Sequence, residues 1–228
     1  MKFIEKEKTK LDRGHFELNR RRLNWSQIAK PKILELCRSF AKDANEQGYP
    51  YHLFCFEGSK DKNAETIQFG IGINFTGIQK KEVQHLENGG IREKSTNVIE
   101  KGSALVFSQG PAGDIMVLLY PYKSEVHARS EDYIVLHRSL LPEELTDSLI
   151  FRALRKSLYY ARISSLNGIA YGLTLMDRFS LFKMKYFDVR SQAKRREAFV
   201  NLTSEWWKVI VAALLALVAA LFAQYLAK

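Results

Sequence analysis

The pattern of apolar and polar residues along this chain predicts a helix followed by a group of strands. From Ser26 to Gln47, apolar side chains recur at the three- and four-residue intervals of one helical face. Pro31 falls in an early turn, where proline is tolerated, and Gly48 ends the pattern. Segments rich in aromatic and β-branched residues then predict five strands, at Tyr51–Glu57, Ile67–Thr76, Ser103–Ser108, Ile115–Tyr122 and Tyr133–Arg138.

Two polar connections interrupt these strands. The longer one, from Ile78 to Gly102, predicts a loop with one helical turn at Lys80–Leu86, and the shorter one covers Lys123–Asp132. Binding residues concentrate on loops that a rigid scaffold positions. We therefore expect loop-borne function in these two segments.

Two further helical patterns follow the last strand. The first opens at Pro142, with acidic residues favourably placed near its start, and Asn167-Gly168 ends it. The second begins near Ile169, and its large apolar positions are Leu173, Met176, Phe179, Phe182 and Phe187. Aromatic residues at helical spacing favour packing against a core. The alternatives are a subunit interface or a helix that lies on the membrane surface.

The last part of the chain has the composition of a membrane span. Fifteen consecutive apolar residues run from Val209 to Ala223. The usable stretch of about 22 residues is long enough to cross the hydrocarbon core of a bilayer. Side chains that prefer the membrane interface stand at its two ends: Trp206, Trp207, Lys208, Tyr225 and Lys228. These features predict a transmembrane helix at 206–228.

The sequence as a whole predicts an α+β protein. It has an N-terminal helix, a mainly antiparallel sheet of about five strands, and two C-terminal helices that lead into one C-terminal transmembrane helix. The predicted parts are a basic N-terminal arm or short helix at 1–24, an α+β domain at 25–168, an amphipathic basic stalk helix at 169–205 and the span at 206–228.

The distribution of charge predicts how the chain is oriented. The formal net charge is +10, but residues 23–177 contain eighteen side chains of each sign and are neutral overall. Residues 178–208 carry +5 directly before the apolar stretch. Basic clusters beside a span stay in the cytoplasm and attract anionic lipid. The residues expected at the membrane interface are Lys194, Arg195, Arg196, Trp206, Trp207 and Lys208.

One face of the predicted span consists of small residues, namely Ala213, Ala216, Ala220, Ala223 and Ala227. Helices in lipid associate where small residues let their backbones approach closely, and Gln224 at the edge of this face could hydrogen-bond to a neighbouring helix. The alanine face therefore predicts self-assembly. The alternative is a simple anchor in which the spacing of alanines is accidental.

No arrangement of residues in the sequence favours catalysis. The five histidines form no His-Glu-x-x-His pair, and His52 and Cys55 would point to opposite faces of a strand. Gly70-x-Gly72 lies inside a strand instead of opening a helix, so no phosphate-binding loop is indicated. We therefore expect no enzymatic activity, no catalytic residue, no metal site and no cofactor.

The best candidate for ligand binding is the segment that ends the fourth strand. Aromatic rings and cations gather there, the mixture that stacks bases and neutralises phosphate: Tyr120, Tyr122, Lys123, His127 and Arg129. The densest cationic point of the N-terminal arm, Arg20-Arg21-Arg22, is added to the candidate residues. The alternative is that the tyrosines cover a sheet edge and the cations are solvated.

A cytoplasmic α+β domain on one C-terminal span with a self-packing face resembles the single-span membrane effectors of bacterial anti-phage defence, and the channel-forming Hailong type is the nearest. The resemblance is one of layout over the whole chain. It implies that Val209–Ala227 is the pore-forming or membrane-disrupting element in the bacterial inner membrane. It also implies that the cytoplasmic domain senses a nucleotide or nucleic-acid signal.

The partners expected from this layout are membrane lipid, further copies of the chain, a nucleotide or oligonucleotide ligand, and a protein from a neighbouring gene. A second hypothesis is a tail-anchored tether that holds a binding domain at the membrane and has no pore activity. Because residues 209–227 of the predicted span contain no charged side chain that would keep a pore wet, this second hypothesis stays open.

Overall fold

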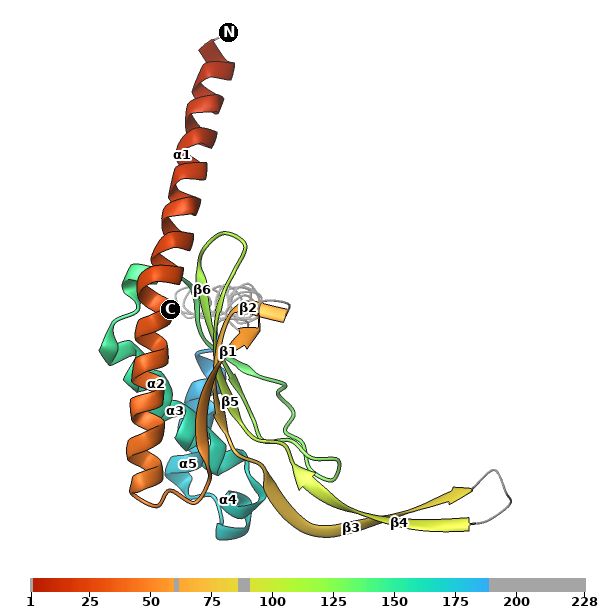
Figure 1. Cartoon of the computed structure of the whole chain (residues 1–228). Helices are drawn as coiled ribbons and strands as arrows, with labels where there is room; N and C mark the ends of the chain where they lie inside the picture. The colour runs from red at the N-terminus through yellow and green to blue at the C-terminus, as the bar shows by residue number, and fades with distance from the viewer. Residues whose placement is uncertain (1, 60–61, 86–90, 189–228) are drawn as a thin grey trace, which may run out of the picture. The chain divides into compact units, whose positions relative to one another are not determined.

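The computed structural model describes residues 2–59, 62–85 and 91–188. The described residues up to Lys185 form one compact unit. Within this unit, helices cover one face of a five-stranded sheet, and a separate two-stranded ribbon extends away from that sheet (Figure 1).

The chain begins with helices that are joined without a break. Helix α1 (Lys2–Asn24) continues through a π-helical turn, η1 (Trp25–Ala29), into α2 (Lys30–Glu46). In the π-turn, the N–H of Lys30 donates to the carbonyl of Trp25, five residues back. Pro31 has no N–H to donate, so a regular α-helix would lose one backbone hydrogen bond at this residue. The wider π-turn lies at the same place. The predicted N-terminal helix is confirmed, and it extends further toward the N-terminus than the pattern from Ser26 indicated.

The main sheet is antiparallel throughout and has the strand order β1-β2-β5-β6-β7. Its strands are β1 (Leu53–Ser59), β2 (Lys62–Ile71), β5 (Ala104–Gln109), β6 (Ile115–Tyr120) and β7 (Ile134–Leu140). The predicted α+β class and the five-stranded antiparallel sheet are therefore confirmed.

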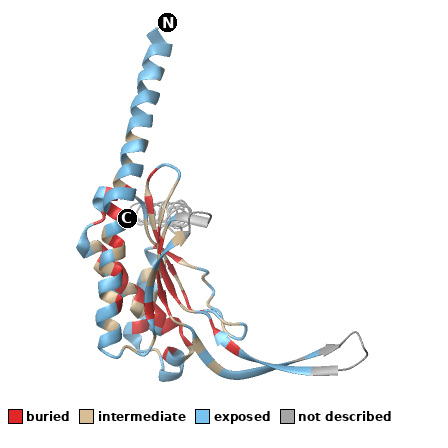
Figure 2. Ribbon diagram, in the orientation of Figure 1, coloured by how far each residue is buried: buried red, intermediate tan, exposed pale blue. Residues whose placement is uncertain are grey.

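Alternate residues of these strands face the helices and form the core (Figure 2). On the sheet side the buried residues include Ile67, Phe69, Leu105, Phe107, Val117 and Leu119. On the helical side, Trp25, Ile33 and Cys37 meet Ile150 and Leu154 of α3 (Asp147–Ser164). Full burial of an apolar side chain of this size stabilises the fold by about 1.5–3 kcal/mol. The core lies on one face of the sheet, and the other face carries the alternate side chains.

The polar stretch between the second and third predicted strands is not a loop. Strands β3 (Asn74–His85) and β4 (Ile91–Glu100) pair there as a two-stranded ribbon, so the predicted loop and its helical turn at Lys80–Leu86 were wrong. The predicted strand Ile67–Thr76 also spans two elements, because β2 ends at Ile71 and β3 begins at Asn74. Most described side chains along the ribbon are exposed on both faces. The alternation of apolar and polar residues that marks a half-buried strand is therefore missing.

The helices after the sheet are divided differently from the predicted pattern. A 3-10 turn, η2 (Pro142–Glu144), precedes α3, and α3 is followed by α4 (Leu166–Tyr171) and α5 (Leu175–Tyr186). Gly172 has a φ of +92°, a conformation that favours glycine, and it separates α4 from α5. The helical pattern that starts near Ile169 is thus two short helices up to Tyr186.

The sequence had favoured packing of the aromatic residues of α5 against the core. In the structure, these residues are exposed instead. Phe179 and Phe182 are each 61% exposed. The residues of α5 that face the core are Leu181 and Met184 instead.

The predicted membrane elements lie outside the described residues. These are the stalk beyond Asp188 with its cations Lys194, Arg195 and Arg196, the interface residues Trp206, Trp207 and Lys208, and the alanine face with Gln224. Across residues 2–59, 62–85 and 91–188, no helix is both long and apolar enough to span a bilayer.

Candidate ligand-binding site

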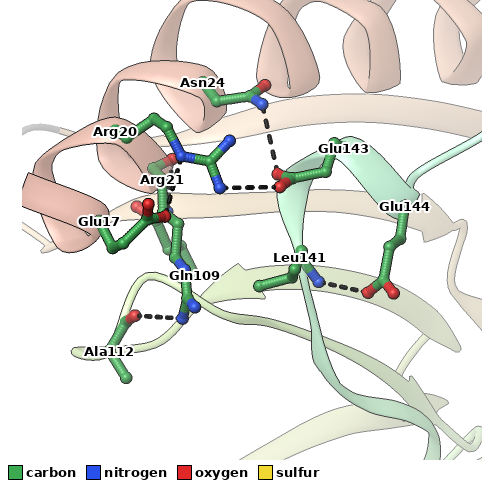
Figure 3. A network of polar contacts seen from close by, with 9 residues as sticks. All are labelled: Glu17, Arg20, Arg21, Asn24, Gln109, Ala112, Leu141, Glu143 and Glu144. Carbon is green, nitrogen blue, oxygen red and sulfur yellow. Dashed lines mark hydrogen bonds and ion pairs between the residues drawn. The ribbon is translucent and has the colours of Figure 1, made fainter. Parts of the chain in front are cut away.

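The arginine triplet at the end of α1 contacts neighbouring elements, and Figure 3 shows Arg20 and Arg21 doing so. Arg20 Nη2 donates to Glu143 Oε1 of η2 at 3.1 Å, and Arg20 Nε donates to Glu17 at 3.0 Å. Arg21 and Arg22 donate to carbonyls of the β5–β6 turn, those of Ala112 and Pro111, each at 3.4 Å. The triplet therefore holds the end of α1 against this turn and η2. It does not converge with the other candidate ligand-binding residues.

Tyr122 belongs to the core, so its assignment to a ligand site is corrected. Its side chain is fully buried, its hydroxyl donates to the carbonyl of Gly72 at 2.7 Å, and its N–H donates to Ser164 Oγ at 3.2 Å. Burial raises the pKa of Tyr122 well above its usual range. A ring in this position is not accessible for stacking on a base.

Three of the predicted residues, Tyr120, Lys123 and Arg129, line one pocket of about 630 Å³ on the face of the sheet opposite the helices. Register explains how the pocket floor forms, because β2, β5 and β6 bring Gln68, Val106 and Leu118 into one row. The volume lies in the range of small-molecule sites, about 300–1,000 Å³.

His127, the remaining predicted residue, does not line this pocket. The backbone N–H of His127 donates to Ser124 Oγ at 3.0 Å, and this hydrogen bond closes the tight turn of the loop. The Nε2 atom of His127 is buried and has no hydrogen-bond partner among the described residues. The structure therefore places His127 in the loop but outside the lining of both pockets.

A second pocket, of about 420 Å³, adjoins the first and is lined by four lysines: Lys80, Lys94, Lys101 and Lys123. Lys123 lines both pockets. Two acidic residues lie nearby, because Lys80 Nζ is 3.4 Å from Glu125 and Lys123 Nζ is 3.9 Å from Asp132. The lining itself holds four lysines and one carboxylate, so its net charge is positive and suits an anion.

Two pairings bring these lysines together. Residues 101 and 123 are bridged by backbone hydrogen bonds of 2.7 and 3.2 Å between each N–H and the opposite carbonyl. In the ribbon, Lys80 lies opposite Thr96, and Lys94 is two residues further along the same strand face. The sequence analysis expected loop-borne function in this segment but did not single out Lys80, Lys94 and Lys101. The alternation of lysine and threonine at positions 94 and 96 was the available signal.

Aromatic residues extend along the outer face of β1. The rings of His52 and Phe54 stack with centroids 6.0 Å apart, and those of Phe54 and Phe56 do the same. Their neighbours Leu53 and Cys55 face the core instead. We call His52, Phe54 and Phe56 the aromatic ladder. Sequence analysis considered His52 only as a metal ligand and missed the ladder.

The aromatic ladder and Tyr120 lie on the same face of the sheet. Pairing across β1, β2, β5 and β6 aligns Phe54, Gly70, Ala104 and Tyr120 in one row. A Cβ atom at Gly70 would lie 2.4 Å from the Phe54 ring, so glycine is what allows this ring to lie over β2. Two small residues therefore separate two aromatic ones, and rings of this kind can stack on nucleic-acid bases.

Glu131 connects the pocket loop to α5. Its carboxylate accepts hydrogen bonds from Arg129 Nε at 2.6 Å and Tyr160 Oη at 3.0 Å, and it lies 2.6 Å from Lys185 Nζ. Burial raises the pKa of Glu131, but the hydrogen bonds from Lys185 and Arg129 more than offset this and lower it to about 2. The carboxylate is therefore ionised at neutral pH and holds the loop Lys123–Asp132 to the end of α5.

Comparison of this chain with protein-family models, with curated proteins and with solved structures found no match. The class of protein therefore rests on the fold and the site. They describe an α+β domain with helices on one face of an antiparallel sheet and an adjoining basic and aromatic surface on the other face.

Proposed function

We propose that this protein is a homo-oligomeric membrane channel or membrane-disrupting effector, gated by a cytoplasmic domain that senses a nucleotide or nucleic-acid ligand, in bacterial anti-phage defence. The observation that carries the proposal is the lysine pocket, which shares Lys123 with the pocket beside Tyr120. A ligand that fits this combination has phosphates for the lysines and a base for the aromatic rings.

The charge of the pocket supports this ligand better than the charge of the domain does. Residues 23–177 are neutral overall, which argues against a long nucleic-acid groove. Four lysines around about 420 Å³ nevertheless make a local positive site. A nucleotide or a short single-stranded oligonucleotide therefore suits the domain better than a duplex.

The contacts of Glu131 supply a route from ligand to membrane. Lys123 at the start of the loop lines both pockets, while Arg129 and Glu131 near its end line the larger pocket, and Glu131 also contacts Lys185. Lys185 lies in the last turn of α5, and the basic residues and the apolar stretch follow it in the sequence. A ligand that pulls Lys123 or Arg129 away from their carboxylate partners would change how the loop holds α5.

The membrane half of the proposal is supported by the sequence, through the apolar stretch Val209–Ala223, the preceding cations and the alanine face. The second candidate function is a tail-anchored tether for the same binding domain. It differs in one property, because a tether conducts no ions.

The binding half can be tested with the full chain in detergent and a fluorescent single-stranded oligonucleotide. Replacing both Lys94 and Lys101 with Ala should weaken binding by about 100-fold or more, because each lysine that donates a hydrogen bond to a phosphate contributes about 1.5–3 kcal/mol. The double variant should also reduce the dependence of affinity on salt. Fluorescence anisotropy measures both effects.

A charge-matched control replaces Lys10 and Lys42 with Ala. These lysines lie on α1 and α2, and their side chains are 61% and 74% exposed. The control should keep the affinity of the unmodified chain. Equal weakening by both pairs would mean that binding follows net charge alone, and the lysine pocket would then not be the site.

A further inference from the structure

Helix α5 exposes a row of large apolar side chains. Leu175 is 82% exposed, Met176 is 73% exposed, and Phe179 and Phe182 are each 61% exposed. With 3.6 residues per turn, Leu175, Phe179 and Phe182 fall within an arc of about 60° on one side of the helix. A surface helix normally turns such a stripe toward the protein core. The outward stripe of α5 therefore faces something other than its own domain.

The opposite side of α5 fixes this orientation. Leu181 and Met184 pack against the core. Asp177 is buried and accepts hydrogen bonds from Arg162 Nη2 at 2.5 Å and Tyr159 Oη at 2.8 Å. These hydrogen bonds lower the pKa of Asp177, so it stays ionised and bound to α3. The helix cannot rotate its stripe inward without breaking this set of contacts.

Cations border the outward stripe on both sides. At about 100° per residue, Arg178 lies along one edge of the stripe and Lys183 lies along the other, while Lys185, on the same edge as Arg178, is paired with Glu131. Long basic side chains in such positions rest their stems on an apolar surface and place their charges at its polar boundary. Asp177, the acidic residue of α5, lies on the buried side.

We propose that α5 lies in the interface of an anionic membrane. Leu175, Phe179 and Phe182 enter the boundary between headgroups and acyl chains, and the bordering cations neutralise anionic headgroups. The order of the sequence supports this occupant, because more cations and then the apolar stretch Val209–Ala223 follow α5. The inference rests on the membrane attachment in the proposed function and is independent of ligand binding.

A second copy of the chain fits the stripe less well. In a symmetric pair of α5 helices, the cationic borders of one helix would meet the cationic borders of the other, and like charges at such spacing destabilise pairing. An anionic lipid surface neutralises the same charges. The charge of the borders therefore favours lipid as the occupant.

The test uses the full chain in lipid nanodiscs, with a photoreactive benzophenone side chain in place of Phe179. Illumination should give a phospholipid adduct that mass spectrometry identifies. Its yield should rise severalfold when phosphatidylglycerol is mixed into phosphatidylcholine. The matched control carries the same probe in place of Phe16, which is 65% exposed on α1. The control should give little lipid adduct in either composition.

The outcomes separate this inference from the proposed function. Crosslinks from position 179 to a second chain would overturn the inference and make the stripe a subunit interface. A lipid yield no higher than that of the control, or one that ignores phosphatidylglycerol, would overturn it too. Release of the chain from the nanodisc by alkaline carbonate would instead refute the membrane anchor, whatever position 179 contacts.

Discussion

The carboxylate of Glu131 meets Arg129, Tyr160 and Lys185, which come from the pocket loop, α3 and α5. Its side chain is only 11% exposed, so these partners replace most of its water. A single residue thus fastens three elements together. Removing its charge should loosen the loop and leave the packing of the core intact. Of its three partners, only Tyr160 belongs to the buried apolar cluster.

Glu131 predicts a dependence of stability on pH. Its folded-state pKa of about 2 lies below the ordinary value of 4.5, so its contribution is present above about pH 4.5 and is lost as the pH falls toward 2. The contribution is of order 2–3 kcal/mol. Urea denaturation of the full chain in detergent at a series of pH values measures it.

The matched variant is Glu131→Gln, which cannot ionise. We expect it to be less stable than the unmodified chain at pH 7 and to converge with it near pH 2. Hydrogen bonds from Arg162 also lower the pKa of Asp177. Asp177 titrates in both proteins, so its contribution cancels when their stabilities are subtracted. Parallel stability curves over the whole range would show that the Glu131 contacts contribute nothing.

At the scale of secondary-structure elements, the ribbon β3–β4 depends on contacts at its foot. Glu100 at the end of β4 is fully buried, and it accepts hydrogen bonds from Asn74 Nδ2 at 3.2 Å and from the N–H of Leu166 at 3.1 Å. An isolated two-stranded ribbon is marginally stable in water. Glu100 therefore joins the ribbon to the start of α4 and positions the lysines that the ribbon supplies.

Replacing Glu100 with Ala should destabilise the fold by about 1–3 kcal/mol, because it leaves buried hydrogen-bond donors without a partner. Hydrogen exchange should quicken along β3 and β4 more than in β5 and β6. Glu46→Ala, an exposed substitution at the end of α2, serves as the control. If exchange in the ribbon did not change, Glu100 would not be its anchor.

The sequence was informative about elements wherever one face of an element is buried. The helix from Ser26 and the strands at 103–108 and 115–122 alternate because one side packs on the core, and their positions were predicted closely. The ribbon has no buried face along most of its length, so it left no such pattern. The candidate site divided in the same way. Tyr120, Lys123 and Arg129 come from one segment, whereas Lys80 and Lys94 reach the site only through strand pairing.

Two surfaces of the whole molecule have different proposed roles. In the proposed function, the outer face of the sheet and the ribbon bind a ligand through cations and rings, and α5 contacts a membrane through its apolar stripe. Glu131 links the two through Lys185. The predicted span adds self-assembly, which the alanine face supports.

The central claim is that a ligand-gated assembly of this chain makes membranes permeable to ions, and ion flux from proteoliposomes tests it most directly. The full chain should release a trapped ion, and a bound oligonucleotide should change the rate. Ala216→Leu with Ala220→Leu should abolish the flux, because the added bulk separates neighbouring helices, while Leu214→Ala with Val218→Ala on the opposite face should preserve it. Proteoliposomes of the unmodified chain that stay sealed with and without oligonucleotide, or an alanine-face variant that conducts as well as its control, would contradict the claim and favour the tether.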